Sequence, residues 1–520
     1  MLEKIIRGSI FCRVLRFLFE SLKSSRFMRI LNAVVCFFAA SFDESRIRRV
    51  LIGRAPMEER TGRDSVVYRV LGGIVGAVNG LFIKLFTAIG KGWDSSLFAK
   101  LFGWVFGKSY AGCYVGLAAF FATFIFLVPH EYWANPLGLF VAAFLYMLYV
   151  IRLAVREPDD TTRPGTHFDA MWLPVLVFGF TLLVGTFTSY DRGDSVRVLT
   201  FFITSLALCF VLYASIRDEK GLQTVGGFMY GVLFVMSLVA LAQRVLGVEA
   251  DAALTDMDLN AGMPGRVFST LANPNNYAEF LVLFLPYAVA FVLALPKGSK
   301  WKKLLALGLI APLLSLLFTY SRSGWIAFAI ALIIFVALYD KKYLPYLIIL
   351  VLVAIPLLPD NIRNRILTIG NMKDTSSSYR VDIWTGCLDM LKDYWFTGIG
   401  LGTGGFAKIY PPYAIGISGV APHSHMHFME MLIELGALGF VGYICMTFTL
   451  IRRSFVAASR RVRGTVRLFA IASAASMTGI IMIGCFEYCW FYPRVMFAFF
   501  VCAGVTMAAA RLARSDLGHE

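Results

Sequence analysis

Three histidines alternate with other residues in the segment PHSHMHFME, at His423, His425 and His427. A neutral imidazole can take a proton from a sugar hydroxyl while that hydroxyl attacks an activated donor. Alternating histidines could also bind a metal ion, with Glu430 as a further ligand. A third interpretation places them in water at the end of an apolar segment. The pattern favours a general base and leaves the other two interpretations open.

Three arginines could stabilise the leaving group of such a reaction: Arg266, Arg322 and Arg380. A guanidinium stays charged and binds phosphate oxygens through two N–H groups at once. Taken singly, each is typical of an arginine in water or at a membrane surface. The prediction of a phosphate site therefore depends on all three meeting the histidines on one side of a membrane.

The composition indicates that the protein resides in a membrane. Apolar residues make up 58% of the 520 residues and charged residues 16%, against about 25% charged residues in soluble proteins. Soluble domains of this total length would lack the charged residues needed to cover their surface. Mean hydropathy is +0.70, so we exclude a soluble protein.

Twelve apolar runs of about 16–22 residues are long enough to cross a hydrocarbon core as helices. They begin near Ala111, Pro136, Met171, Val198, Val225, Glu279, Lys303, Trp325, Tyr343, His427, Leu468 and Phe491. The runs at Lys303 and Trp325 are short and could form one broken helix, so the count could change by one or two. The sequence predicts an all-α polytopic membrane domain over residues 111–520.

The basic residues in short connections predict the orientation of the spans. The connection after the tenth run has no acidic residue and contains Arg452, Arg453, Arg460, Arg461, Arg463 and Arg467. Such clusters stay in the cytoplasm, and alternation from there places both termini in the cytoplasm. The predicted site and a long connection, residues 359–424, then lie outside. Connections longer than about 15 residues are usually functional, so we expect the chemistry there.

Residues 1–110 differ from the rest of the chain. They hold most of the excess of basic residues that gives the chain its net charge of +16. Arg, Lys and Gly interrupt the short apolar stretches 30–42 and 71–89, which predicts amphipathic helices on anionic lipids of the inner leaflet. An alternative is that 71–89 forms one of two additional spans. Because basic residues beside apolar segments contact lipid or retain loops, we expect no nucleic acid partner.

A glycine-rich run follows the amphipathic helical pattern that Arg380 opens. Gly400, Gly402 and Gly405 match the dinucleotide-binding fingerprint by letter. No strand–helix–strand pattern surrounds them, and the run lies on the wrong side of the membrane for a nicotinamide cofactor. We therefore expect a turn.

Four segments together resemble one family. PHSHMHFMEMLIELGALG resembles the histidine signature of the O-antigen ligase and Wzy polymerase superfamily, in which a short polar motif ends a large periplasmic loop and runs into a span. RVFSTLANPNNYAEFL, TYSRSGWIAF and YRVDIWTGCLDMLKDYWFTGIGLG are similar to the family's other landmarks and stand in the same order. The resemblance covers about residues 188–510 and leaves residues 1–110 outside.

The resemblance implies a metal-independent glycosyltransferase of the multi-span class, without a cofactor, whose donor is an undecaprenyl-diphosphate-linked glycan. The acceptor would be a glycan, a lipid or a wall polymer. The Glu-Leu-Gly segment at 434–436 fixes the register and places the family's catalytic histidine on His425. The family's diphosphate-binding arginines fall on Arg266, Arg322 and Arg380. Attack from the face opposite the diphosphate would invert the anomeric centre.

Two further details bear on substrate binding. Asn273 and Asn276 match the family's polar pair after the first arginine, where they would bind sugar or phosphate; helix capping is the alternative. The family usually has Asn directly after the catalytic histidine, whereas this chain has Met426. The missing amide leaves room for His423 or His427 to share in the site.

The sequence thus predicts a glycan ligase or polymerase of cell-surface polysaccharide biosynthesis in the inner or plasma membrane. A transporter of lipid-linked glycan or small solute is the alternative, because twelve spans are typical of transporters. It predicts matching halves with broken helices, and we see no such repeat. An inactive scaffold is a third hypothesis, supported by Met426 alone.

Overall fold

The computed structural model describes residues 20–53, 65–90, 110–154, 163–166, 172–248, 265–370, 375–459 and 464–515, with a few isolated positions between them. Every regular element in these ranges is a helix. Ten helical segments there are long and apolar enough to cross a membrane, and two shorter apolar helices accompany them. The protein is a polytopic membrane protein, and the all-α prediction is confirmed. Arg460, Arg461 and Arg463 lie outside the described ranges.

Each predicted apolar run coincides with helix. The helices are α8 (Tyr110–Phe124), α9 (Asn135–Ala154), α10 (Leu173–Phe187), α11 (Arg192–Ser215), α12 (Glu219–Leu246), α13 (Pro274–Ala294), α14 (Lys300–Gly308), α15 (Ile310–Phe318), α16 (Arg322–Asp340), α17 (Leu344–Leu357), α21 (His427–Ser459), α22 (Gly464–Gly484) and α23 (Pro493–Ser515). Together α14 and α15 make one span, and α16 continues into α17 over Arg322–Leu357. The break expected between the runs at Lys303 and Trp325 therefore separates α15 from α16.

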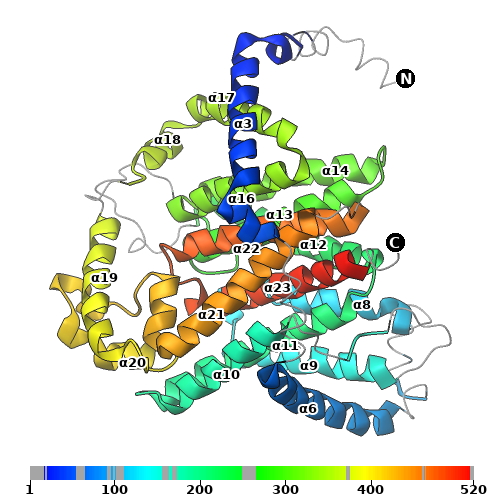
Figure 1. Ribbon diagram of the computed structural model, residues 1–520, viewed down its shortest axis with the longest axis vertical. Coiled ribbons are helices and arrows are strands. Elements are labelled where there is room, and N and C mark those ends of the chain that lie inside the picture. The colour runs from blue at the N-terminus through cyan, green and yellow to red at the C-terminus, as the bar shows by residue number, and fades with distance from the viewer. Residues whose placement is uncertain are drawn as a thin grey trace.

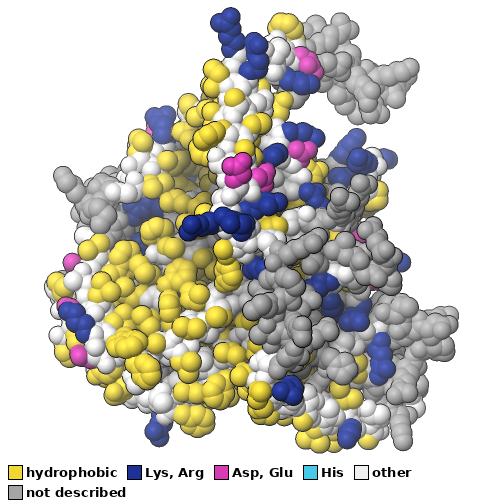
Figure 2. Space-filling view, viewed as in Figure 1, with side chains coloured by type: hydrophobic (Ala, Val, Ile, Leu, Met, Phe, Trp, Pro, Cys, Tyr) yellow, Lys and Arg dark blue, Asp and Glu magenta, His cyan; other side chains and the backbone are white. Residues whose placement is uncertain are grey.

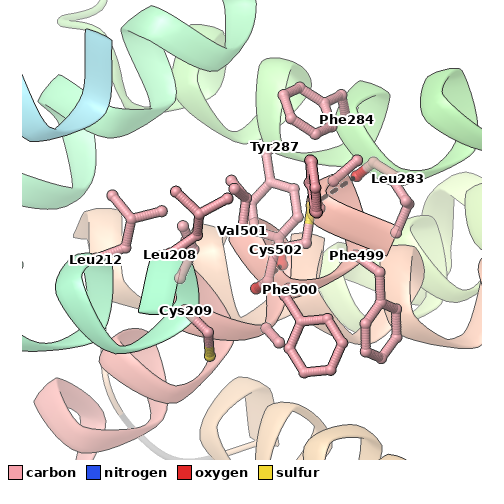
Figure 3. Close-up of a cluster of buried hydrophobic side chains, with 14 of the residues drawn as sticks. Leu208, Cys209, Leu212, Leu283, Phe284, Tyr287, Phe499, Phe500, Val501 and Cys502 are labelled. Atoms are coloured by element: carbon pink, nitrogen blue, oxygen red, sulfur yellow. Dashed lines mark hydrogen bonds between the residues drawn. The ribbon is translucent and has the colours of Figure 1, made fainter. Parts of the chain in front are cut away.

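The centre of the bundle is packed by α11, α13 and α23 (Figure 3). Tyr287 is fully buried there, and its hydroxyl lies 3.1 Å from Ser473 Oγ and 3.0 Å from Thr506 Oγ1. These contacts satisfy a polar group that lipid and apolar side chains could not. A side chain at Gly504 would meet the main-chain oxygen of Cys209 at 2.6 Å, so a small residue lets α23 approach α11 closely.

The connection over 359–424 is folded. It contains α18 (Asp360–Leu367), α19 (Thr375–Tyr394) and α20 (Thr403–Ile409), which gather at one end of the bundle, while α23 ends on the opposite side of the view (Figure 1). A small core of its own includes Ile383, Cys387, Phe406, Tyr410 and Ile433. The helical pattern expected to open at Arg380 is α19. A folded connection can hold side chains rigidly over the ends of the spans.

Three helices are described within residues 1–110: α3 (Arg26–Glu44), α4 (Arg46–Ile52) and α6 (Val66–Gly90). Figure 2 shows apolar side chains along α3, as well as a broad apolar surface over α10 and α21. On α3 the exposed apolar residues include Phe27, Ile30, Val34, Phe37 and Phe38. These exposed apolar side chains would suit a lipid surface, and the predicted amphipathic role of this region stays a prediction.

α6 packs against α9, where the Tyr146 hydroxyl donates to Asn79 Oδ1 at 2.6 Å. Its segment Val66–Leu85 is also long and apolar enough to cross a membrane. Both interpretations of this helix, interfacial and spanning, therefore stand. The boundary between residues 1–110 and 111–520 stays a prediction.

Candidate active site

A cavity of about 340 Å³ lies where α16, α18, α19 and the connection between α22 and α23 come together. Its polar lining includes Arg266, Asn275, Tyr320, Arg322, Arg365, Arg380, Trp384 and Glu487. The three arginines singled out from the sequence thus meet around one space, and a fourth joins them. A cavity with this much positive charge suits a ligand that carries several negative charges.

Arg266 is buried beside the start of α13. Its Nε donates to the main-chain oxygen of Thr319 at 2.8 Å, and its Nη2 donates to Asn275 Oδ1 at 2.7 Å. Burial lowers the pKa of Arg266 to about 9, and the neighbouring charge of Arg365 acts in the same direction. The guanidinium therefore stays charged at neutral pH. Because it is buried near other cations, an anionic ligand beside it would be favourable.

Arg322 and Arg365 also line the cavity. Arg322 begins α16, where Ser321 caps the helix, and its Nη1 donates to the main-chain oxygen of Thr368 at 3.1 Å. Arg365 comes from α18, is 8% exposed, and directs its Nε to the main-chain oxygen of Tyr320 at 3.5 Å. The contacts between α18 and the Tyr320 turn therefore hold both arginines in the lining of the cavity.

Sequence reasoning missed Arg365. The available signal was its spacing from Ile362, because residues three apart share a helix face and both are buried on α18. A buried arginine on the inner face of an amphipathic helix would have been a fourth candidate.

Arg380 and Glu487 form an ion pair at the edge of the cavity. Arg380 Nη2 lies 2.5 Å from Glu487 Oε1, and the same oxygen accepts a hydrogen bond from Asn275 Nδ2 at 3.1 Å. Burial alone would raise the pKa of Glu487, but the charge of Arg380, together with the neighbouring His425, outweighs burial and lowers that pKa to about 2. Glu487 is therefore ionised at neutral pH.

Glu487 also faces the histidines. Its Oε2 lies 3.9 Å from His425 Nδ1, a distance longer than a hydrogen bond. Nothing in the sequence marked Glu487, since it lies in the short connection between the last two spans. Its partners Asn275 and Arg380 are more than a hundred residues away in the chain.

The three histidines have different surroundings. His425 is partly exposed, with 24% of its side chain accessible, whereas His423 and His427 are buried. The N–H of His425 donates to His423 Nδ1 at 3.1 Å, and burial lowers the pKa of His423 to about 3. His423 is therefore a neutral acceptor that holds the main chain of His425.

His427 lies among aromatic rings. Its ring centroid is 4.5 Å from that of Trp490, 5.1 Å from that of Tyr443 and 5.5 Å from that of Tyr488. Of the three histidines, His425 is thus the one that a substrate hydroxyl could reach. Within the described ranges, no group of three or more His, Cys, Asp or Glu is arranged to hold a metal ion.

Four residues other than glycine adopt left-handed backbone conformations in the described ranges: Ser269 (φ 53°), Ala272 (φ 64°), Tyr320 (φ 51°) and His425 (φ 53°). Such conformations are costly for these residue types and gather at sites that the surrounding structure holds firmly. Gln243 of α12 supplies part of this support, because its Oε1 accepts the N–H of Ser269 at 2.8 Å and its Nε2 donates to the Ser269 oxygen at 2.9 Å. The site is therefore built on a constrained backbone.

The predicted asparagine pair is divided by the structure. Asn273 caps α13, and its Oδ1 accepts the N–H of Asn275 at 2.8 Å, as the capping alternative expected. Asn275, which lies between the two predicted residues, lines the cavity. Asn276 is half-buried and is not among the described residues that line it. A role for Asn273 or Asn276 in substrate binding stays a prediction.

The glycine-rich run docks on a break in α21. Gly436 has φ 64° and ψ −171° inside this helix, and the N–H groups of Ile399 and Gly400 donate to the main-chain oxygens of Ile433 and Glu434 at 2.9 and 3.0 Å. A side chain at Gly400 would meet Ser189 Oγ at 2.0 Å. The glycines thus allow close backbone packing, and the expected turn holds α19 against the histidine segment.

The fold and this cavity define a polytopic membrane protein with an arginine-lined site at one end of its helix bundle. Residues 282–444 match the O-antigen ligase family model, Wzy_C, which confirms the family resemblance over this range. No curated protein matches the chain. The matched range includes Arg322, Arg365, Arg380 and His425, while Arg266, Asn275 and Glu487 lie on either side of it.

Proposed function

We propose that this protein is a glycan ligase or polymerase that uses an undecaprenyl-diphosphate-linked glycan as donor. The observation that supports it most directly is the convergence of Arg266, Arg322, Arg365 and Arg380 on one cavity, beside the partly exposed His425. The O-antigen ligase family match implies a lipid-linked glycan substrate. A diphosphate has the charge and the oxygen geometry that several guanidinium groups bind best.

In the proposed reaction, His425 takes the proton of the acceptor hydroxyl as its oxygen bonds to the anomeric carbon. Because Nδ1 lies on the Glu487 side, Nε2 is the nitrogen that receives the proton. The bond from the anomeric carbon to the diphosphate oxygen breaks, and undecaprenyl diphosphate leaves. The arginines stabilise the charge that develops on the diphosphate without requiring a metal ion. Attack from the face opposite the diphosphate inverts the anomeric centre.

We place this reaction at the extracytoplasmic face, with both termini in the cytoplasm. The basic residues that support this orientation, such as Arg452 and Arg467, belong to the connection between α21 and α22. The cavity lies beyond the other end of α22, where Glu487 lines it. The acceptor in this proposal is a glycan, a lipid or a wall polymer.

Anionic lipids are the proposed partners of residues 1–110. Arg452 of α21 donates to the main-chain oxygens of Val50 and Gly53 at 2.9 and 3.0 Å. This contact attaches α4 to the basic end of α21, so that the exposed apolar side chains of α3 start beside the predicted cytoplasmic surface. An amphipathic helix in this place would bind the headgroup region.

The test is glycan transfer by the purified full-length protein in lipid nanodiscs. With an undecaprenyl-diphosphate-linked oligosaccharide and an acceptor glycolipid, mass spectrometry should detect a new glycosidic bond. His425→Ala and Arg380→Ala should lower the transfer rate by about 100-fold or more, whereas Arg363→Ala, which alters an exposed arginine of α18, should not. Full activity of both site variants would contradict the proposal. Movement of the donor across proteoliposome membranes without bond formation would favour the transporter.

A further inference from the structure

Glu487 belongs to two networks at once. Its Oε1 binds Arg380 Nη2 at 2.5 Å and Asn275 Nδ2 at 3.1 Å. Its Oε2 faces His425 Nδ1 at 3.9 Å, and no described group hydrogen-bonds to that buried nitrogen. One carboxylate therefore bridges the arginines that suit a diphosphate and the histidine that suits a hydroxyl.

The ion pair places the charges of Arg380 and Glu487 against each other, while the buried Nε of Arg380 has no hydrogen-bond partner among the described residues. An unpaired charge in a buried position is costly, and the side chains of Glu487 and Arg380 are only 12% and 21% exposed. A diphosphate in the cavity would offer Arg380 several charged oxygens in place of one. The donor and Glu487 are therefore competitors for the same guanidinium.

The contact with His425 is almost formed. A nitrogen–oxygen hydrogen bond has a length of about 2.7–3.2 Å, so a rotation of the carboxylate that moves Oε2 by about 1 Å would close the 3.9 Å gap to Nδ1. The buried Nδ1 would then gain the acceptor that it lacks.

We propose that donor binding moves Glu487 from Arg380 to His425 and thereby completes the general base. This inference rests on the proposed function and names how the site is regulated: the diphosphate takes Arg380, and the released carboxylate accepts the Nδ1–H of His425. The ring is then fixed with Nε2 free for the acceptor hydroxyl. When the proton arrives at Nε2, the adjacent carboxylate stabilises the imidazolium. Glu487 is thus a positioning residue that delays proton abstraction until a donor is bound.

Other charged or titratable groups near His425 do not offer this link. His423 uses Nδ1 to accept the main-chain N–H of His425, with ring centroids 4.2 Å apart. Tyr379 of α19 places its ring centroid 6.3 Å from that of His425. Arg380 reaches His425 through Glu487. The carboxylate is therefore the group through which a change at the arginines would reach the imidazole.

The experiment compares wild type, Glu487→Gln and Glu487→Asp as full-length proteins in nanodiscs, each checked for a normal unfolding temperature. Binding of undecaprenyl diphosphate is measured by microscale thermophoresis. Glu487→Gln should bind it about fivefold more tightly or better, because Arg380 is no longer paired with a carboxylate. The same variant should transfer glycan about 10–100-fold more slowly, and Glu487→Asp should recover part of that rate. Asp389→Asn, an exposed acid on α19, is the matched control and should match wild type.

A spectroscopic readout follows the imidazole directly. The chain has six histidines, so nitrogen-15 labelling of histidine gives few ring signals, and His425→Gln identifies the one of interest. Undecaprenyl diphosphate should shift the Nδ1–H proton of His425 downfield in wild type and leave it unchanged in Glu487→Gln. An unshifted wild-type signal, or weaker diphosphate binding by Glu487→Gln, would overturn the exchange.

The two proposals fail in different ways. If wild type forms no glycosidic bond, the proposed function fails, while the binding and imidazole measurements still decide whether Glu487 exchanges partners. If wild type transfers glycan but neither measurement responds to Glu487, the exchange is wrong and the transferase stands.

Discussion

The indole N–H of Trp384 donates to the main-chain oxygen of Ser424 at 3.0 Å. Trp384 is one turn beyond Arg380 on α19, and Ser424 directly precedes His425. Ser424 is fixed from the other side as well, because its N–H donates to Glu430 Oε2 at 2.6 Å. The helix that carries an arginine of the site and the turn that carries its histidine are therefore held together by one hydrogen bond.

Trp384→Phe should lower the transfer rate by about tenfold, because loss of a buried hydrogen bond costs about 1–3 kcal/mol and lets the histidine turn shift relative to α19. The rate is measured with saturating donor in nanodiscs. Trp395→Phe replaces an exposed tryptophan just beyond the same helix and should match wild type. Equal rates for the two variants would show that this bond does not position the site.

Arg365→Ala should weaken diphosphate binding by about 10–100-fold, since hydrogen bonds to charged groups contribute about 1.5–3 kcal/mol. Equilibrium binding of undecaprenyl diphosphate measures the change. Arg363→Ala is the matched control on the same helix, because Arg363 is 43% exposed and pairs with Asp360. If both variants bind equally well, Arg365 lines the cavity without binding the anion.

His427→Phe should keep the transfer rate within about threefold of wild type, whereas His425→Phe should abolish transfer. His427 is enclosed by Trp490, Tyr443 and Tyr488, and no described group hydrogen-bonds to its buried Nδ1. Replacing it with an apolar ring removes a desolvation cost of about 1–3 kcal/mol, so the unfolding temperature should not fall. A strong loss of transfer in a stable His427→Phe protein would instead support a role in substrate binding.

Gly436→Ala should destabilise the protein by about 2–5 kcal/mol, from a left-handed conformation and an overpacked contact together. An alanine Cβ there would lie 2.2 Å from the main-chain oxygen of Phe396 at φ 64°. Thermal unfolding in detergent measures the loss. Gly231→Ala on α12 meets nothing within 4 Å and should be neutral or stabilising; similar melting temperatures for both variants would contradict the account of the α21 break.

Stability should fall as the pH is lowered from about 6.5 towards 3, because the pKa of His423 is lowered to about 3 in the folded protein. In that window the unfolded chain binds a proton that the buried imidazole does not, so acid favours unfolding. The slope from this residue is at most about 1.4 kcal/mol per pH unit. His423→Asn keeps an acceptor for the His425 N–H and removes the titration. Its unfolding temperature should depend less on pH between 7 and 4 than that of wild type; parallel curves would count against this cause.

Much of the fold follows from the sequence because lipid imposes a simple rule. A long apolar run must be helical to satisfy its own backbone, so all twelve runs appear as helices. The sequence also allowed the long connection, His425 and the three arginines to be predicted. Histidine and arginine have few uses at a membrane boundary, which narrows their possible roles. The folding of 359–424 into α18, α19 and α20 brings Arg365 and Arg380 to one cavity with Arg266 and Arg322.

The remaining site residues depend on contacts between distant segments. Asn275 and Glu487 are 212 residues apart and acquire their roles from one hydrogen bond. Gly400 fits a nucleotide-binding fingerprint by letter, but the structure explains the glycine differently: Ser189 lies so close that no side chain would fit there. The sequence did not single out Asn275 within the asparagine run, because helix capping by Asn273 and cavity lining by Asn275 occur within one turn, which no spacing rule separates.

The positions of Arg266 and Glu487 outside residues 282–444 limit how the range that matches the O-antigen ligase family can be recombined. A chimera that exchanges the matched range between two proteins would carry Arg322, Arg365, Arg380 and His425 as a block. It would inherit from the recipient both the first arginine and the carboxylate that Arg380 contacts at 2.5 Å. Compatible exchanges should therefore be those in which the segment that carries Arg266 and the last two spans travel with the matched range.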